Sequence, residues 1–418
     1  MSCNFLPVSL VLNSGCIKND IMKIRTGKGF ITIWTLLGIW SVSALTSLPG
    51  LAISPISEKL LTVFPDATEL DIQMLTTLPS LFIIPFILLS GYISEKIGYI
   101  KLLYIGLWAY LISGALYFVC SSMRQLIVVS VLLGIGSGII IPLSTAMIPK
   151  FFSGAERTRQ YGYISAITNI TLVVATAVTG YLADIQWRLP FLVYLLPLVS
   201  ILLTPSIEHG EYSLSQNLDD EKEKDSHSNY VNYKSLVKYM LYYLLITYLV
   251  MAVSINLPYL MGKYGYDSGV SGVVISVFFI AMMLPGFFIN RIIDVFKGNL
   301  LLFAMLLIAL GMLDVFFNRS VWFITLGCIA AGFGYGMAQP YIYDVAATLA
   351  SARKVTYTLA LVMTMNYVAI LISPFVVDFM EKVLGNSTER FPFALNSVVA
   401  FLALAFMLVL RIFKKYKS

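Results

Sequence analysis

The sequence predicts an all-α polytopic membrane protein with twelve transmembrane helices in two pseudo-symmetric six-helix bundles. Three observations support this fold class. The 418 residues are 58% hydrophobic and only 12% charged, which is about half the charged share of a typical soluble domain. Apolar runs recur along nearly the whole chain, and several short motifs recur in the same order in both halves.

The apolar runs are continuous rather than alternating, which indicates helices and not the strands of a barrel. About 20 apolar residues cross the hydrocarbon core as a helix. The predicted spans are 30–52, 70–93, 100–120, 125–147, 161–183, 189–205, 236–260, 269–290, 298–316, 321–344, 357–379 and 393–412. The predicted parts are a leader without regular structure (1–29), an N-terminal bundle (30–205), a charged linker (206–235), a C-terminal bundle (236–412) and a basic tail (413–418).

The basic residues predict the orientation. Of the 28 lysines and arginines, 21 lie in the leader, the tail, the linker and the loops on the same side, and seven lie in the remaining loops. Basic residues of short loops stay on the cytoplasmic side. We therefore expect both termini in the cytoplasm and the chain in the plasma membrane, with lipid as its surroundings.

Several function classes lack their motifs. The four cysteines are scattered without a CxxC pair, and no HExxH occurs, so no metal or other cofactor is expected. No GxSxG lies near a histidine and no GxxxxGK[ST] loop is present, which argues against an intramembrane enzyme and against ATP-driven transport. The net charge of +6 is explained by the loop pattern and needs no nucleic-acid partner.

An internal repeat relates the two halves. The pattern G-x-G-x-G-x-x-x-P occurs as GIGSGIIIP at 134–142 and as GFGYGMAQP at 332–340. Further matches in the same order are Gly91-x-x-x-Glu95-Lys96 with Gly286-x-x-x-Asn290-Arg291, and Asn169 with Asn366. A duplicated six-helix unit is typical of secondary transporters, whose site lies between the repeats near the midplane and is exposed alternately as one half rocks against the other.

The segment LLSGYISEKIGYIKLLY (88–104) joins the second and third spans and carries five notable residues, namely Gly91, Glu95, Lys96, Gly98 and Lys101. We expect both glycines to allow close backbone approach. Glu95 can meet a helix N-terminus of the other half, or a nearby lysine or arginine. A contact that exists in only one rocking state acts as a latch between states.

This segment resembles the loop signature G-x-x-x-D-[RK]-x-G-[RK]-[RK] of the major facilitator superfamily, with Glu95 in place of the aspartate. AERTRQYG (155–162) and WRLPF (187–191) also resemble segments of that family. The resemblance covers about 30–412 and implies a monomeric secondary transporter. It implies that Glu95 contacts the end of the eleventh helix in the outward-facing state. It also adds Arg157 and Arg291 to the conformational-switch loops.

Two departures from the drug:proton antiporter branch are visible. Ser130 stands where such exporters carry an arginine, and VVATAVTGYL keeps only Gly180 of their helix-five signature. The exporter branch is therefore favoured by general shape and not by its own signatures. This resemblance implies proton-coupled efflux of small amphipathic compounds. An uptake symporter or uniporter for a nutrient remains the alternative.

In the superfamily, helices one, four, seven and ten line the cavity, with five and eleven close by. The candidate substrate-binding residues are Trp40, Ser43, Ser47, Ser130, Asn169, Thr247, Ser254, Gln339, Tyr343 and Asn366. The three amides are foremost, because a buried amide in hydrocarbon is costly unless it is paired or faces water. Alternatively, each of these amides forms hydrogen bonds between helices and does not bind substrate.

Few ionisable groups lie within the spans. Asp344 lies near the end of the tenth span, where we expect Arg291 or Arg353-Lys354 beside it, either in a structural ion pair or as the proton-coupling group. A cavity rich in aromatic and hydroxyl groups but poor in charge suits an amphipathic, neutral or lipophilic cation-like small molecule. Sugar phosphates would need paired basic residues within the helices, which the sequence lacks.

Overall fold

The computed structural model describes residues 23–49, 60, 63–65, 69–216, 230–386 and 388–417. The predicted leader up to residue 22, the linker residues 217–229 and the predicted end of the first span after residue 49 lie largely outside these residues.

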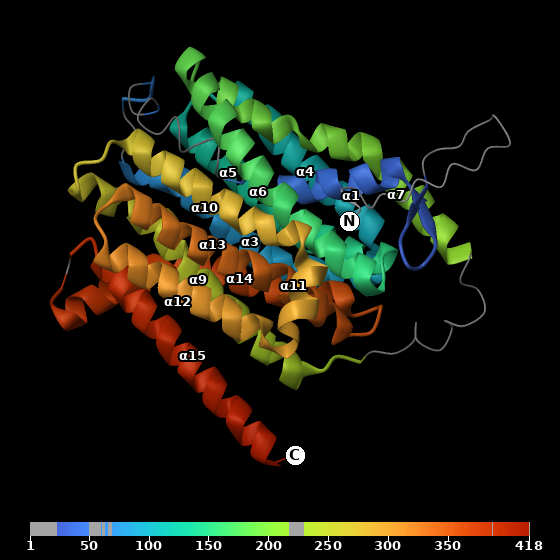
Figure 1. The fold of residues 1–418 in the computed structure, drawn as a ribbon. Coiled ribbons are helices and arrows are strands. Elements are labelled where there is room, and N and C mark those ends of the chain that lie inside the picture. The colour runs from blue at the N-terminus through green and yellow to red at the C-terminus, as the bar shows by residue number, and fades with distance from the viewer. Residues whose placement is uncertain are drawn as a thin grey trace, which may run out of the picture.

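The described chain is almost entirely helical (Figure 1). In chain order its elements are β1 (Lys23–Arg25), β2 (Phe30–Thr32), α1 (Ile33–Leu45), α3 (Glu69–Ile97), α4 (Tyr99–Val119), α5 (Met123–Phe151), α6 (Gly154–Ile185), the 3-10 helix η2 (Leu189–Leu195), α7 (Pro197–Gln216), α9 (Tyr233–Lys263), α10 (Ser268–Phe287), α11 (Ile289–Phe296), the 3-10 helix η3 (Lys297–Asn299), α12 (Leu300–Phe317), α13 (Val321–Thr348), α14 (Val355–Leu384) and α15 (Phe391–Lys417). Eleven helical segments of the described chain are long and apolar enough to cross a membrane, and α1 is a shorter apolar helix at the first predicted span. The predicted all-α membrane fold is confirmed.

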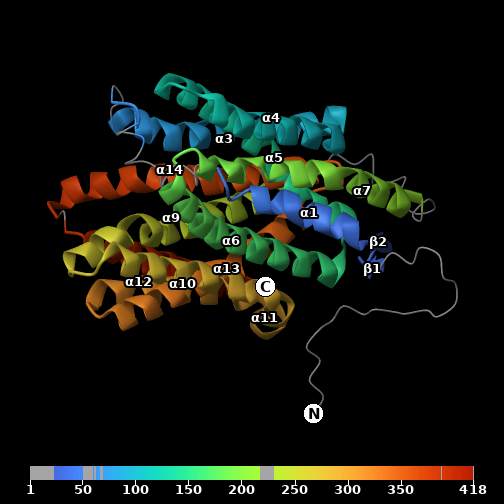
Figure 2. The same ribbon diagram turned by 90° about the horizontal axis from the view of Figure 1, so that it is seen from above.

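Two groups of helices face each other across a seam (Figure 2). The N-terminal half comprises α1 and α3–α7, and the C-terminal half comprises α9–α15. Across the seam, α14 packs against α3 and α5, while α6 packs against α10 and α13. The outer helix α15 packs mainly on α12, and its C-terminal part extends away from the bundle (Figure 1).

The repeated glycine motif packs in the same way in both halves. In the N-terminal half, an added Cβ on Gly134 or Gly138 would meet α3, at Pro79 and Phe86 respectively, and one on Gly136 would meet Tyr110 of α4. In the C-terminal half, an added Cβ on Gly332 or Gly336 would meet α10, at Phe278 and Met282 respectively, and one on Gly334 would meet Ala304 of α12. Because lipid supplies no hydrophobic force between helices, such close contacts supply much of the packing energy.

The helix that leads into the linker is longer than predicted. The predicted sixth span ends at residue 205, whereas α7 continues to Gln216. This extension packs on α1, where the Thr35 hydroxyl donates to the Ser206 carbonyl oxygen at 2.8 Å and Ile207 is fully buried against Gly38. The packing partner keeps the chain helical although its sequence is polar.

The end of the leader also has regular structure. Residues 23–29 were predicted to have none, but β1 pairs with β2 in an antiparallel hairpin. The turn is tied to the end of α5, because the Ser153 amide donates to the Thr26 carbonyl at 3.0 Å and the Lys28 ammonium donates to the Lys150 carbonyl at 3.0 Å. These long-range bonds are not visible in the local sequence.

We expect Gly136→Leu and Gly334→Leu to destabilise the protein. A Cβ at Gly136 would lie 2.7 Å from the Tyr110 nitrogen, and one at Gly334 would lie 2.6 Å from the Ala304 oxygen. Overpacking of this kind costs about 1–3 kcal/mol, which thermal unfolding in detergent measures. Gly180→Leu is the matched control, because nothing lies within 4 Å of its Cβ position. Equal losses in all three variants would contradict the packing assignment.

Candidate functional site

One end of the bundle is closed by an ion pair between the halves. We call it the linker end, because α7 ends and α9 begins there, on either side of the linker. Glu95 lies in the last turn of α3 and Lys354 is the N-cap residue of α14. The Lys354 ammonium lies 3.1 and 2.8 Å from the two Glu95 carboxylate oxygens, and the side chains are only 25% and 10% exposed.

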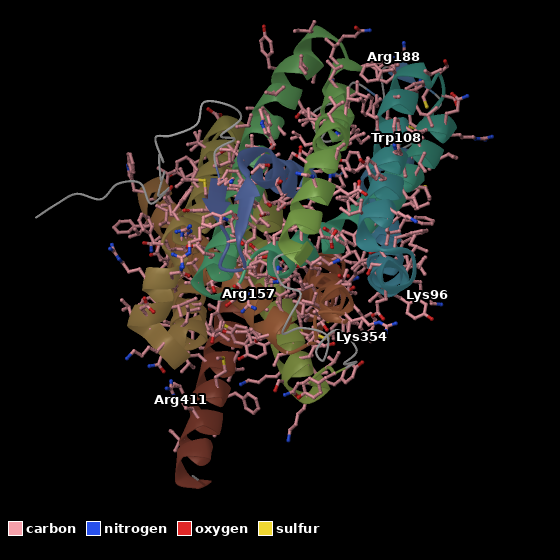
Figure 3. All side chains as sticks on the ribbon, turned by 90° about the vertical axis from the view of Figure 1, so that its right-hand side faces the viewer. Lys96, Trp108, Arg157, Arg188, Lys354 and Arg411 are labelled. Carbon is pink, nitrogen blue, oxygen red and sulfur yellow. The ribbon has the colours of Figure 1, made fainter. Side chains whose placement is uncertain are left out.

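A second ion pair crosses the seam at this end. The Arg157 Nε atom lies 2.7 Å from the Asp344 Oδ1 atom, and the Thr158 hydroxyl donates to Oδ2 at 2.8 Å. The predicted pairing of Asp344 with Arg291 or Arg353-Lys354 is therefore incorrect. Helix α13 continues past Asp344 to Thr348, so this carboxylate lies on a helix that packs against α6 of the other half, while the following loop carries Lys354 to Glu95. Figure 3 views the bundle from the linker end with Arg157 and Lys354 labelled.

Backbone contacts complete the closure. A Cβ on Gly91 of α3 would lie 2.7 Å from the Ala360 Cβ of α14. At the equivalent place, Gly286 of α10 meets Gly162 of α6, and a Cβ on either would overlap the carbonyl oxygen of the other. Asn290, the repeat counterpart of Glu95, donates through Nδ2 to the carbonyl oxygen of Ala155 at 2.9 Å. The seam is thus closed twice, by contacts related by the repeat.

The other residues assigned to the switch loops lie differently. Gly98 begins α4 with φ of +83°, and nothing lies within 4 Å of its Cβ position. It therefore supplies a turn conformation and not the predicted close approach. Lys96 lies over the Tyr92 ring of its own helix, 4.5 Å from the centroid, and Lys101 and Arg291 are exposed.

A cavity of about 360 Å³ lies between the halves. Its lining residues are Thr46, Ser47, Pro49, Ser80, Ile83, Ile141, Ser144, Thr145, Ile164, Ser165, Thr168, Asn169, Leu172, Met251, Phe279, Met282, Tyr335, Gln339, Tyr343, Met363, Asn366, Tyr367 and Ile370. None of these described lining residues is Asp, Glu, His, Lys or Arg. The lining includes Thr46, Ser47 and Pro49 beyond the end of α1 and no residue of the two ion pairs, so the cavity is separate from the charged contacts of the linker end.

The structure brings five of the ten predicted cavity residues together. Those that line the cavity are Ser47, Asn169, Gln339, Tyr343 and Asn366, and those outside the lining are Trp40, Ser43, Ser130, Thr247 and Ser254.

The residues outside the lining have local partners or are buried. Trp40 donates through Nε1 to Gln160 at 3.1 Å. The hydroxyls of Ser43 and Ser130 donate to carbonyl oxygens of their own helices at 2.9 and 2.7 Å, and both side chains are fully buried. The Ser254 hydroxyl is buried without a hydrogen-bond partner among the described residues. Sharing a helix face with a lining residue therefore does not place a side chain in the cavity.

Gln339 links the two halves at the cavity wall. Its Oε1 atom accepts a hydrogen bond from the Ser165 hydroxyl of α6 at 3.0 Å, and its Nε2 atom donates to the Tyr243 hydroxyl at 3.1 Å. The hydroxyls of Tyr243 and Tyr343 lie 2.6 Å apart. The amide is thus engaged at both ends, and the network joins α6, α9 and α13 without any charge.

A second branch ends at Asn366. Its Oδ1 atom accepts from the Tyr335 hydroxyl at 3.2 Å and from the Thr247 hydroxyl at 3.3 Å. Tyr335 and Tyr243 are not among the residues predicted from the sequence. The spacing of Tyr335, Gln339 and Tyr343 at i, i+4 and i+8 was the available signal, because such positions share one face of a helix.

Comparison with known proteins gives one family across the chain. The sequence profile of the Major Facilitator Superfamily matches residues 35–374 and 239–417. The human organic anion transporter MFSD10 (TETRAN) superposes with a TM-score of 0.69 at 16% identity, over 89% of this chain and 98% of that structure. The proton:xylose symporter XylE superposes with a TM-score of 0.65 at 15% identity, over 90% and 94%. Both show a shared fold.

Two curated relatives match over part of their length. The quinolone resistance protein NorA of Staphylococcus aureus is 26% identical over 114 residues, which are 27% of this chain and 29% of that protein. The multidrug transporter protein MdtP of Bacillus subtilis is 28% identical over 109 residues, which are 26% of this chain and 20% of that protein. The matched stretch is thus less than a third of either relative.

We expect Glu95→Gln to favour opening of the linker end. The substitution removes a charge-assisted contact between mostly buried partners, which corresponds to about 1–2 kcal/mol, or about a fivefold to thirtyfold change in the open-to-closed ratio. Spin labels at Lys101 and Arg291, both exposed and on opposite halves, report this ratio by electron–electron distance measurement in a background without the four native cysteines.

Glu381→Gln is the matched control, since this glutamate lies near the opposite end of α14. Lys354→Met should shift the ratio as Glu95→Gln does, and the double variant should shift it no further. An unchanged distance distribution in Glu95→Gln, or additive effects in the double variant, would contradict the assigned contact.

Proposed function

Since this chain belongs to the major facilitator superfamily, we propose that it exports small amphipathic compounds by alternating access, driven by protons that move inward. The chain is a multi-pass membrane transporter of that family. The direction of transport, the compounds and the coupling ion are the proposed part.

The charge-free cavity between the halves is the observation that carries the proposal. Its polar groups are hydroxyls and amides and the rest of its lining is aliphatic, aromatic or thioether. Apolar walls with a few polar groups are typical of sites for drug-sized ligands. A dianion would have to lose its hydration without gaining a cationic partner from the described lining, which is costly, so the proposal excludes sugar phosphates.

The partial relatives support export. The proteins that match in sequence are named for quinolone resistance and multidrug transport. Uptake of an uncharged nutrient is the second candidate, and the replacement of the helix-five exporter signature by VVATAVTGYL favours it. A cavity of hydroxyls and amides also accommodates a neutral polyol.

The proposed orientation puts the linker end in the cytoplasm of a cell, with the chain as a monomer in the plasma membrane. The excess of basic residues on that side supports this orientation. The conformation is then outward-facing, and Glu95–Lys354 and Arg157–Asp344 act as latches that break when the cavity opens inward.

Asp344 is the proposed coupling group. Its carboxylate is 15% exposed and bonded to both Arg157 and Thr158 across the seam. Protonation would remove the charge that attracts Arg157, and the linker end would then open more readily. Proton binding and the direction of access would be linked in this way.

Everted membrane vesicles test the direction of transport. With an acidified lumen, a neutral dye such as Nile red or a monocationic dye such as rhodamine 123 should accumulate inside, because the proton gradient then drives export into the lumen. If such dyes fail to accumulate, while a neutral sugar enters right-side-out vesicles on external acidification, the uptake candidate is correct.

We expect Asp344→Asn to abolish accumulation in these vesicles and to leave passive equilibration of the dye measurable, because the carboxyl that takes the proton is gone. Asp378→Asn is the control, since Asp378 pairs with Lys382 four residues away on α14 and both side chains are exposed. Proton-driven accumulation by Asp344→Asn at the wild-type rate would exclude Asp344 as the coupling group.

A further inference from the structure

The two walls of the cavity differ in chemistry. The wall from α9, α10, α13 and α14 presents four aromatic rings, those of Phe279, Tyr335, Tyr343 and Tyr367, together with three methionine sulfurs. The facing wall comes from the N-terminal half, and none of its described lining residues is aromatic or contains sulfur. The repeat thus places unlike surfaces opposite each other, so a bound molecule meets a different environment on each side.

Most hydroxyls of the N-terminal wall already donate their hydrogen to a hydrogen bond within the protein. Thr46, Ser47 and Ser144 each donate to the carbonyl oxygen three residues earlier in the chain, at 2.7, 3.2 and 2.8 Å. A hydroxyl that has donated its hydrogen offers only lone pairs to a ligand. The hydroxyls of Ser80 and Thr168 have no such bond to a described residue and can act either way. The wall therefore has a surplus of acceptors.

Asn169 adds the strongest acceptor to this wall. Its Nδ2 atom donates to the Ser165 backbone carbonyl at 2.8 Å. A carbonyl oxygen can only accept, so this contact identifies which amide atom is the nitrogen and uses one of its two hydrogens. Among the described residues Oδ1 has no hydrogen-bond partner, which makes it available to a donor on a ligand.

The opposite wall suits a flat ring. Aromatic side chains prefer offset-stacked or edge-to-face contacts with another ring, and thioether sulfur makes favourable contacts with rings as well. Asn366, the repeat counterpart of Asn169, has its Oδ1 atom engaged by Tyr335 and Thr247. Among the described residues, the free acceptor of this amide pair is therefore Oδ1 of Asn169, on the N-terminal wall.

We propose that the cavity selects flat aromatic molecules that carry N–H or O–H groups along one edge, with the ring against the C-terminal wall and the donors toward Asn169. This inference rests on the proposed function, in which the transported compound occupies this cavity. Each donor lost from such a molecule leaves an acceptor of the N-terminal wall unpaired, which costs affinity.

A matched pair of dyes tests the inference. Rhodamine 123 and tetramethylrhodamine methyl ester share a flat monocationic ring system and an ester, but only rhodamine 123 carries N–H groups. Their affinities for the full-length protein in lipid nanodiscs are measured by fluorescence polarisation. We expect Asn169→Leu to weaken rhodamine 123 by about threefold to tenfold, as for one lost hydrogen bond, and to change the other dye less than twofold.

Two further variants separate the walls. Phe279→Leu should weaken both dyes alike, because it removes ring contact and no hydrogen bond. Asn396→Leu is the matched control, since Asn396 is a fully buried asparagine of α15 outside the cavity lining, and it should change neither dye. Equal loss of both dyes in Asn169→Leu, or no loss, would overturn this inference alone. If the wild-type protein binds neither dye, the proposed substrate class fails together with it.

Discussion

The seam between the halves is the constraint on which this structure depends. Helices in lipid gain nothing from the hydrophobic effect when they associate, so they are held by close backbone packing and by polar contacts. The glycine contacts Gly91–Ala360 and Gly162–Gly286 bring backbones of opposite halves together at the linker end. Because they are related by the repeat, one rotation of the halves would loosen both. Packed interfaces of this kind favour discrete arrangements over gradual deformation, which is what the proposed alternating access requires.

The charged contacts of the seam and the cavity lie apart. Among the described residues, the two ion pairs that join the halves lie at the linker end, whereas the lining of the cavity is neutral. An ion pair with little exposure is costly to break while its partners stay buried, but much less so when opening admits water. The pairs therefore favour two end states over intermediate ones. A neutral cavity in turn leaves binding of an uncharged or singly charged molecule to shape, ring contacts and hydrogen bonds.

The sequence was sufficient for the fold because its signals are local or periodic. Twelve apolar runs and the G-x-G-x-G-x-x-x-P repeat gave the helices, the duplication and the place of the cavity. The hairpin of Lys23–Thr32 and the extension of α7 were missed because both depend on tertiary bonds, to Ser153 and to Thr35. Asp344 lies on the predicted helix, but its partner differs from the predicted one. Side-chain pairing across the seam depends on how each helix is rotated about its axis, and a single sequence does not reveal this rotation. The same uncertainty of rotation explains why Ser43 and Ser130 lie outside the cavity while Asn169 and Asn366 line it.

A reversible cross-link across the seam tests the central claim, that transport requires the linker end to open. Asn290 and Ala155 are in contact between the halves, so Asn290→Cys with Ala155→Cys, without the native cysteines, can be oxidised to a disulfide. If the linker end must open, the cross-linked protein should still bind a dye from the far side but should not transport it, and a reducing agent should restore transport. Transport at the uncross-linked rate with the disulfide intact would show that opening of the linker end is not required.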